Sequence, residues 1–144
     1  PMRNARDRLL LALSQASHID DGDIATSVRA ITQAAVEGLG VDRCRIWMRA
    51  ADAQSIRCIH LYDLADAGHR DVPDLVLNAG QYPRYFEALG RERAIVAHDA
   101  PEHPDTAEFA HGYLDVLGIR SMLDCPVRQH GRMVGILCAE HRGS

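Results

Sequence analysis

The C-terminal part of the chain contains two apolar runs that are joined by a short polar turn. The first run is IRSMLDCPV at 119–127, the second is RMVGILCAEH at 132–141, and RQHG lies between them. Two strand-like runs on either side of a glycine-containing turn predict a β-hairpin, so the fold must contain antiparallel pairing. The hairpin region also carries two cysteines and two histidines, which raises the question of a metal or redox site.

Upstream of the hairpin, the spacing of apolar residues changes between helical and extended periods. Helical spacing predicts four helices, at 3–17, 24–39, 82–90 and a last one that contains 109–117. Period-two or short apolar runs predict five strands, at 43–49, 55–62, 94–99, 119–127 and 132–141. Residues 63–80 are mostly typical of a loop, with a short apolar patch at 75–77. Helices before and between five strands argue for an α+β fold.

The composition excludes several classes of protein. Sixteen basic and twenty acidic residues give a net charge of −4, which argues against a nucleic-acid or anionic-membrane surface. All the basic residues are arginine, so a Schiff-base lysine and a P-loop lysine are both excluded. No apolar run approaches the roughly 20 residues of a membrane span. Four scattered cysteines do not suit a secreted disulfide scaffold, so we expect a reducing, cytoplasmic environment.

The hairpin cysteines are better explained as packing residues than as a reactive centre. Cys138 and His141 are three positions apart and should point to opposite faces of a strand. Cys125 and Cys138 lie on adjacent predicted strands and could approach each other, although the spacing does not require it. A structural zinc site usually has a tight Cys-x-x-Cys loop, and the chain has none. A metal or redox role of these side chains is the alternative.

Two further groups of side chains are candidates for chemistry. Period-two spacing places Cys58 and His60 on one strand face, where a third group could complete a metal or haem-iron site. A hydrogen-bonded core histidine is the interpretation that we favour. Glu108, His111 and Asp115 share one face of the last predicted helix, opposite its apolar stripe. They could bind a metal, but we expect them to face solvent.

The element order and the terminal hairpin resemble the GAF family of small-molecule sensor domains. GIRSMLDCPVRQHGRMVGILCAEH is similar to the family's terminal hairpin, and YPRYFEALGRERAIVAHDA is similar to the variety found in bacterial sensor proteins. The resemblance implies a central antiparallel sheet of five or six strands. It places terminal helices on one face, and ligand-pocket helices and loops on the other. It implies a signalling or dimer helix at 1–19 and a GAF-like domain at 20–144 that lacks the family's C-terminal helix.

The same resemblance implies a ligand pocket beneath the middle helices. Aromatic side chains at 82–86 would form a lid, with large contact areas and polar tips that orient a ligand. By this analogy the ligand-binding residues are Tyr82, Tyr85, Phe86, His98, Asp99, Tyr113, His60 and Tyr62. The lysine-containing signature of cyclic-nucleotide members is absent, and EFAHGYLDVLG lacks the cysteine that attaches a bilin in phytochrome-like members. We predict no catalytic residue, no metal and no cofactor.

These observations together favour a binding module over an enzyme. We expect a regulatory domain that binds an unidentified small molecule and relays the signal to a covalently attached effector. In the family, such effectors are histidine kinases, diguanylate cyclases or phosphodiesterases of two-component and cyclic-di-GMP signalling. We also expect a homodimer without nucleic-acid or membrane contact. The alternatives are a structural dimerisation module with a vestigial pocket, a thiol-based redox, metal or haem sensor, and an enzyme that uses Cys125 or Cys138 as a thiolate.

Overall fold

The computed structural model describes residues 21–50, 54–65, 68–70, 75–91, 94–109, 114, 118–129 and 132–142. Its helices are α2 (Asp21–Leu39), α3 (Pro83–Arg91) and the short 3-10 helix η1 (Ala107–Phe109). Its strands are β1 (Arg43–Arg49), β2 (Ser55–Asp63), β3 (Gly68–Arg70), β4 (Val76–Asn78), β5 (Ile95–Ala97), β6 (Ile119–Gln129) and β7 (Arg132–Arg142). The helix predicted at 3–17 lies outside the described residues.

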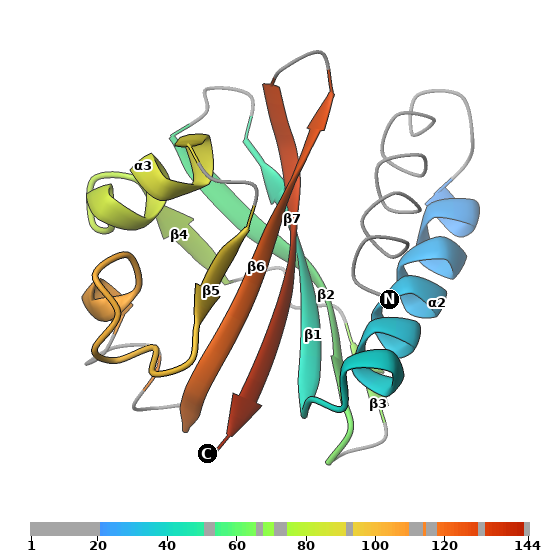
Figure 1. The fold of residues 1–144 in the computed structure, drawn as a ribbon. Helices are drawn as coiled ribbons and strands as arrows, with labels where there is room; N and C mark the ends of the chain where they lie inside the picture. The colour runs from blue at the N-terminus through green and yellow to red at the C-terminus, as the bar shows by residue number, and fades with distance from the viewer. Residues whose placement is uncertain are drawn as a thin grey trace.

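All the strand pairs of the sheet are antiparallel. The strand order is β3-β2-β1-β7-β6-β5, and β4 also pairs with β2. Figure 1 shows α2 on one face of this sheet and α3 with the segment around η1 on the other face. We call these the α2 face and the α3 face. The predicted α+β fold and the terminal hairpin, now β6 and β7, are confirmed.

Helix α2 covers its face through the apolar stripe that the sequence predicts. Val28, Ile31 and Ala35 are buried and pack with Cys44, Ile46 and Leu137 of the sheet. The helix ends because Gly40 adopts φ 67°, a left-handed conformation that lets its N–H bond the Val36 carbonyl at 2.9 Å. The chain then turns directly into β1, which is why a helix and a central strand lie so close in sequence.

The α3 face carries the second core. Its large buried side chains include Trp47 of β1, Tyr85 of α3, Phe109 of η1 and Ile136 of β7. Both faces of the central strands are therefore covered, which explains why β1 has buried residues at consecutive positions.

The structure differs from the sequence-based prediction in two segments. Residues 68–70 and 76–78, which we expected to be loop, form strands β3 and β4, so the sheet of the described residues has seven strands and not five or six. GHR and VLN are too short to show a period, and they become strands because β2 offers them a free edge. Of the helix predicted to contain 109–117, only Phe109, the last residue of η1, and Leu114 are described, so most of that prediction lies outside the described residues.

Helix length also bears on membrane contact. Within the parts of the chain that the structure describes, no helix is both long enough and apolar enough to cross a bilayer.

Candidate functional site

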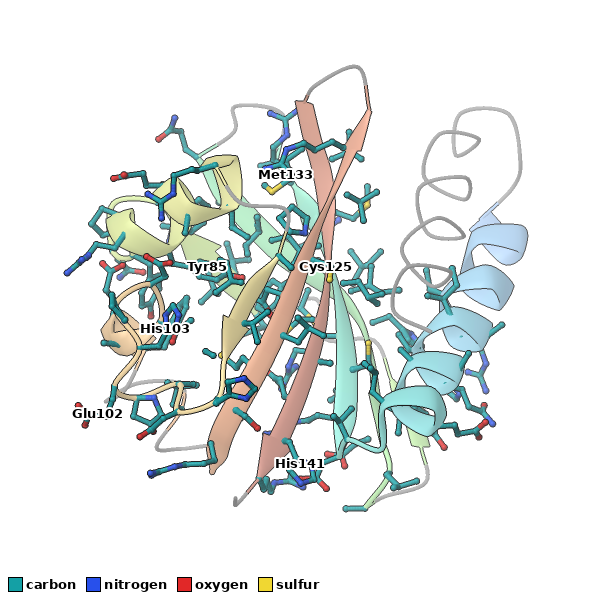
Figure 2. The ribbon with its side chains drawn as sticks, viewed as in Figure 1. Tyr85, Glu102, His103, Cys125, Met133 and His141 are labelled. Carbon is teal, nitrogen blue, oxygen red and sulfur yellow. The ribbon has the colours of Figure 1, made fainter. Side chains whose placement is uncertain are left out.

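Helix α3 is held against the sheet by side chains of η1 and β6. Its first turn begins with Tyr82 and Pro83, neither of which offers a side-chain acceptor of the kind that usually caps a helix. Glu108 of η1 replaces that cap, because its Oε1 accepts a hydrogen bond from the Tyr85 N–H at 2.9 Å. At the other end, the Arg128 guanidinium donates to the Leu89 carbonyl. Figure 2 shows the Tyr85 side chain lying between α3 and the sheet.

Tyr85 connects α3 to a buried carboxylate of β6. Its ring is 2% exposed, and its hydroxyl donates a hydrogen bond to Oδ2 of Asp124. Asp124 is completely buried, and its Oδ1 has no hydrogen-bond partner among the described residues. Burial raises the pKa of Asp124 to about 6, and the charge of Glu140 contributes in the same direction, while hydrogen bonds from Cys138 and Tyr85 oppose the rise. The carboxylate therefore has unused hydrogen-bonding capacity in a place without water access.

Beside Asp124, a row of charged side chains crosses the α3 face. Glu140 of β7, Arg43 of β1 and Asp63 of β2 lie directly opposite one another in the strand register. The Glu140 carboxylate is 3.0 Å from Nε of Arg43 and 3.1 Å from Nε of Arg45, and Asp63 is 3.7 Å from Nη1 of Arg43. All four of these side chains are buried. We call Arg43, Arg45, Asp63, Asp124 and Glu140 the charged floor.

The charged floor was missed by the sequence analysis, although the sequence contains a signal for it. Asp124 and Glu140 interrupt the apolar runs of the terminal hairpin, and Arg43 and Arg45 alternate with apolar residues in a strand that turns out to be central. Charged residues in a strand covered on both faces must be buried, and buried charges must be paired. The sequence alone does not give the strand order, which is what shows that β1 is a central strand whose charged residues must be buried.

Three of the predicted ligand residues come together under α3. The ring centroids of Tyr82 and Phe109 are 4.5 Å apart, those of Tyr85 and Phe109 are 4.7 Å apart, and those of Tyr85 and Phe86 are 5.9 Å apart. Tyr82 and Phe86 are half-buried at the edge of this cluster. An aromatic layer above a charged floor is thus the chemistry present on the α3 face. That Tyr82, Tyr85 and Phe86 bind a ligand stays a prediction.

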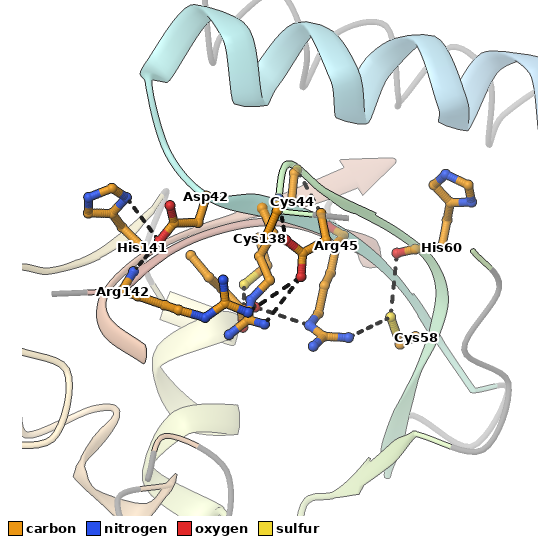
Figure 3. Close-up of polar contacts among 12 residues, drawn as sticks. Asp42, Cys44, Arg45, Cys58, His60, Cys138, His141 and Arg142 are labelled. Carbon is orange, nitrogen blue, oxygen red and sulfur yellow. Dashed lines mark hydrogen bonds and ion pairs between the residues drawn. The ribbon is translucent and has the colours of Figure 1, made fainter. Parts of the chain in front are cut away.

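The structure separates His60 and Tyr62 from that cluster. A β-bulge between β1 and β2 pairs Trp47 with Cys58 but Ile46 with His60, so Cys58 and His60 point to opposite faces. Figure 3 shows His60 directed toward α2 and Cys58 on the other side of the strand. The prediction that Cys58 and His60 share a face is therefore wrong, because one extra residue reverses the alternation. His60 and Tyr62 do not line one pocket with Tyr85.

The remaining predicted residues lie apart from Tyr85 or outside the described chain. His98 is exposed and borders a cavity of about 200 Å³ on the α2 face, together with Val41, Leu123 and His141. Asp99 lies after β5 and is 3.3 Å from Nη2 of Arg120. Since His98 follows β5 at the opposite pleat from the buried Ala97, it is directed away from α3. Tyr113 lies outside the described residues.

The four cysteines are all free and buried. Cys125 packs on the α2 face and Cys138 on the α3 face, so the two do not approach each other across the hairpin. Burial raises the pKa of Cys44, Cys58 and Cys138, which opposes formation of a thiolate. Among the described residues, no group of three or more His, Cys, Asp and Glu side chains could hold a metal ion.

The prediction that Glu108 faces solvent is wrong. We expected it to face solvent together with His111 and Asp115, but its carboxylate is half-buried and caps α3. The reason is that η1 is a 3-10 helix, whose side chains follow a different angular spacing from those of an α-helix. His111 and Asp115 lie outside the described residues.

Comparisons with known proteins agree with this architecture. The model of the GAF domain family matches residues 23–144. The chain is similar to the phycocyanobilin-bound GAF domain of a cyanobacterial phytochrome, with 19% identity, a TM-score of 0.69, and coverage of 100% of this chain and 81% of that one.

Two other solved structures show the same fold. The GAF domain of an Acinetobacter phosphoenolpyruvate-protein phosphotransferase has 15% identity and a TM-score of 0.61, covering 96% of this chain and 77% of that one. The GAF domain of a Bacillus halodurans two-component sensor histidine kinase has 18% identity and a TM-score of 0.55, covering 78% and 74% respectively. None of the curated proteins compared matches the sequence. The family model covers most of the chain and the sheet topology agrees with it, so this chain belongs to the GAF domain family.

Proposed function

We propose that this chain is a regulatory sensor domain that binds a small molecule between α3 and the charged floor. The observation that carries the proposal is Asp124, a fully buried carboxylate whose Oδ1 has no hydrogen-bond partner among the described residues. Leaving such an oxygen unsatisfied costs about 1–3 kcal/mol. A ligand with an N–H or O–H donor would satisfy it, and the rings of Tyr82, Phe86 and Phe109 offer the apolar contact that ligand sites usually have.

The proposed mechanism uses α3 as the moving part. A ligand with a second donor, besides the one that satisfies Oδ1 of Asp124, competes with the Tyr85 hydroxyl for Oδ2. Displacing Tyr85 loosens α3, whose nine residues are too few to form a stable helix alone. The ligand shifts this equilibrium only as far as its affinities for the two arrangements of α3 differ.

The output of the domain is also part of the proposal. The solved structures similar to this chain include the GAF domain of a two-component sensor histidine kinase and residues 122–287 of a methyl-accepting chemotaxis protein. Their setting supports a regulatory role within a larger signalling protein. We propose that this chain acts in the cytoplasm as a homodimer that controls an attached effector, such as a kinase, a diguanylate cyclase or a phosphodiesterase. We also propose that it is not itself an enzyme, which the buried, high-pKa thiols support.

A thermal-shift screen of polar metabolites against three proteins tests the proposed site. The proteins are the wild type, Asp124→Asn, and Glu87→Gln as a matched change of a carboxylate on the exposed side of α3. We expect compounds that raise the melting temperature of the wild type and of Glu87→Gln, with a much smaller effect on Asp124→Asn. Compounds that stabilise all three proteins equally would show that binding does not involve Asp124. A screen of broad chemistry without any stabilising compound would contradict sensing by this site.

A further inference from the structure

A second polar cluster lies on the α2 face and takes no part in the proposed ligand site. Nε2 of His60 on β2 lies 2.9 Å from Nδ1 of His69 on β3. Nε2 of His69 lies 3.3 Å from Oε1 of Gln33 on α2, and Nε2 of Gln33 donates to Glu37 at 3.2 Å. These four side chains form a continuous hydrogen-bonded chain from the sheet to helix α2.

The Glu37 carboxylate, at the end of this hydrogen-bonded series, determines which group donates in each hydrogen bond. The Glu37 carboxylate is only an acceptor, so the Gln33 amide nitrogen faces it and the Gln33 oxygen faces His69. His69 must then donate through Nε2, which leaves its Nδ1 as the acceptor of the His60 Nε2–H. His69 is therefore neutral in this arrangement, with its lone pair directed at His60.

The surroundings of the pair make a second positive charge unfavourable. His60 is 3% exposed, so a charge on its ring is poorly solvated. Burial lowers the pKa of His69, and the positive charge of Arg29 on α2 acts in the same direction. The charged or titratable groups near the pair include Arg29 and Glu37 of α2, Cys44 of β1 and Tyr62 of β2.

The His60–His69 pair can take up two protons, and the two steps have different consequences. A cationic His60 still donates through Nε2, so the pair can hold one additional proton without losing its hydrogen bond. A second proton must bind Nδ1 of His69, and two N–H donors would then face each other across 2.9 Å. That state requires His60 and His69 to separate, which moves β3 and removes the contact of His69 with Gln33 on α2.

We propose that the His60–His69 pair is a proton sensor, which releases helix α2 from strand β3 when both imidazoles are protonated. Because burial and Arg29 lower the pKa of His69 from its ordinary value of about 6.5, the release belongs to acidic pH below that value. The signal reaches α2 without passing through the site under α3. Proton sensing is therefore a second input to the domain, on the opposite face of the sheet from the proposed ligand.

Amide hydrogen exchange at pH 7.5 and 5.5, corrected for intrinsic rates, tests this proposal. The variant is His69→Gln, whose amide can accept from His60 and donate to Gln33 but does not titrate. The matched control is His98→Gln at the opposite edge of the sheet. In the wild type and in His98→Gln, we expect the protection factors of the amides at 29–37, divided by those of β7, to fall about fivefold from pH 7.5 to pH 5.5. A lost hydrogen bond of about 1 kcal/mol corresponds to a change of that size. In His69→Gln, the protection of these amides relative to β7 should be the same at both pH values. An equal loss in His69→Gln, or no loss in the wild type, overturns the proposal.

Imidazole ¹⁵N NMR of the wild type provides a test that does not depend on a variant. At pH 7.5 we expect His69 in the Nε2–H tautomer, followed on acidification by two separate protonation steps of the pair. Finding His69 in the Nδ1–H tautomer at pH 7.5, or both rings titrating together as isolated histidines, would contradict the assigned chain.

Discussion

At the scale of single residues, the α3 face is unusual for the charges that it buries. Five charged side chains form its floor, and each is less than 5% exposed. Buried ion pairs seldom add net stability over apolar packing, because desolvating two charges costs about as much as their attraction returns. The charged floor is therefore better explained by a requirement of function than by a requirement of folding.

Asp124 should make the stability of the domain depend on pH in a specific direction. Its pKa is about 6 in the folded chain and near 3.8 when unfolded, so its contribution is most favourable below pH 3.8 and is lost as pH rises through 6. Replacing it with asparagine removes this dependence. The unfolding free energy of Asp124→Asn minus that of the wild type should therefore rise by about 2 kcal/mol between pH 4 and pH 7. Urea unfolding of both proteins at several pH values measures the difference, and a constant difference would contradict the assignment.

Glu140 should be the costliest carboxylate to neutralise. Its replacement by glutamine leaves the buried Arg43 and Arg45 without the charge that lies 3.0 and 3.1 Å from them. We expect Glu140→Gln to lose about 3 kcal/mol of unfolding free energy, as is typical when one partner of a buried pair is removed. Glu87→Gln, which breaks an exposed pair with Arg91, should change it by less than about 0.5 kcal/mol. Similar losses in both variants would contradict the pairing.

At the scale of elements, α3 depends on contacts that its own sequence does not provide. Glu108 caps its first turn, Asp124 binds its middle and Arg128 binds its last turn. A short helix held in this way can be displaced when one contact changes, which suits a lid over a ligand site.

Removing the cap should loosen α3 selectively. We expect Glu108→Ala to lower the hydrogen-exchange protection of the amides at 85–89 by about five- to tenfold, because a lost helix cap costs about 1 kcal/mol. The amides of β6 and β7 should be unaffected. Glu102→Ala in the exposed loop before η1 is the control. If α3 amides exchange equally fast in both variants, Glu108 is not the cap that the structure describes.

How far the sequence predicts the elements depends on where their partners lie. Helix α2 and the β6–β7 hairpin follow from local spacing alone, so their prediction is confirmed almost to the residue. Strands β3 and β4 are three residues each and exist through pairing with β2, which local patterns do not encode. The bulge that separates Cys58 from His60 likewise arises from strand pairing. The aromatic part of the candidate site was predictable, but the charged floor was not, because it requires the strand order.

At the scale of the whole molecule, the sheet separates two polar systems. The charged floor and Tyr85 lie on the α3 face, whereas His60 and His69 lie on the α2 face with the helix that leads into the domain. A fold of this kind can combine two inputs, because each can act on a different helix. The sheet and its two coverings bury all four cysteines, which does not favour the formation of a reactive thiolate.

The burial of the cysteines predicts their labelling behaviour. At pH 7, all four thiols should react with iodoacetamide slowly, at rates that rise together with urea as the whole domain unfolds. The labelling rates, followed by mass spectrometry, measure this directly. If one thiol reacts much faster than the others in the absence of urea, the prediction is wrong, and the result would favour a thiol enzyme or a redox sensor.

The most direct test of the central claim is to map where a stabilising metabolite binds, by two-dimensional NMR of the chain. We predict that the largest chemical-shift changes centre on Tyr85, Asp124 and Phe109, beneath α3. Changes centred instead on Val96, His98 and His141, which border the cavity on the α2 face, would contradict it.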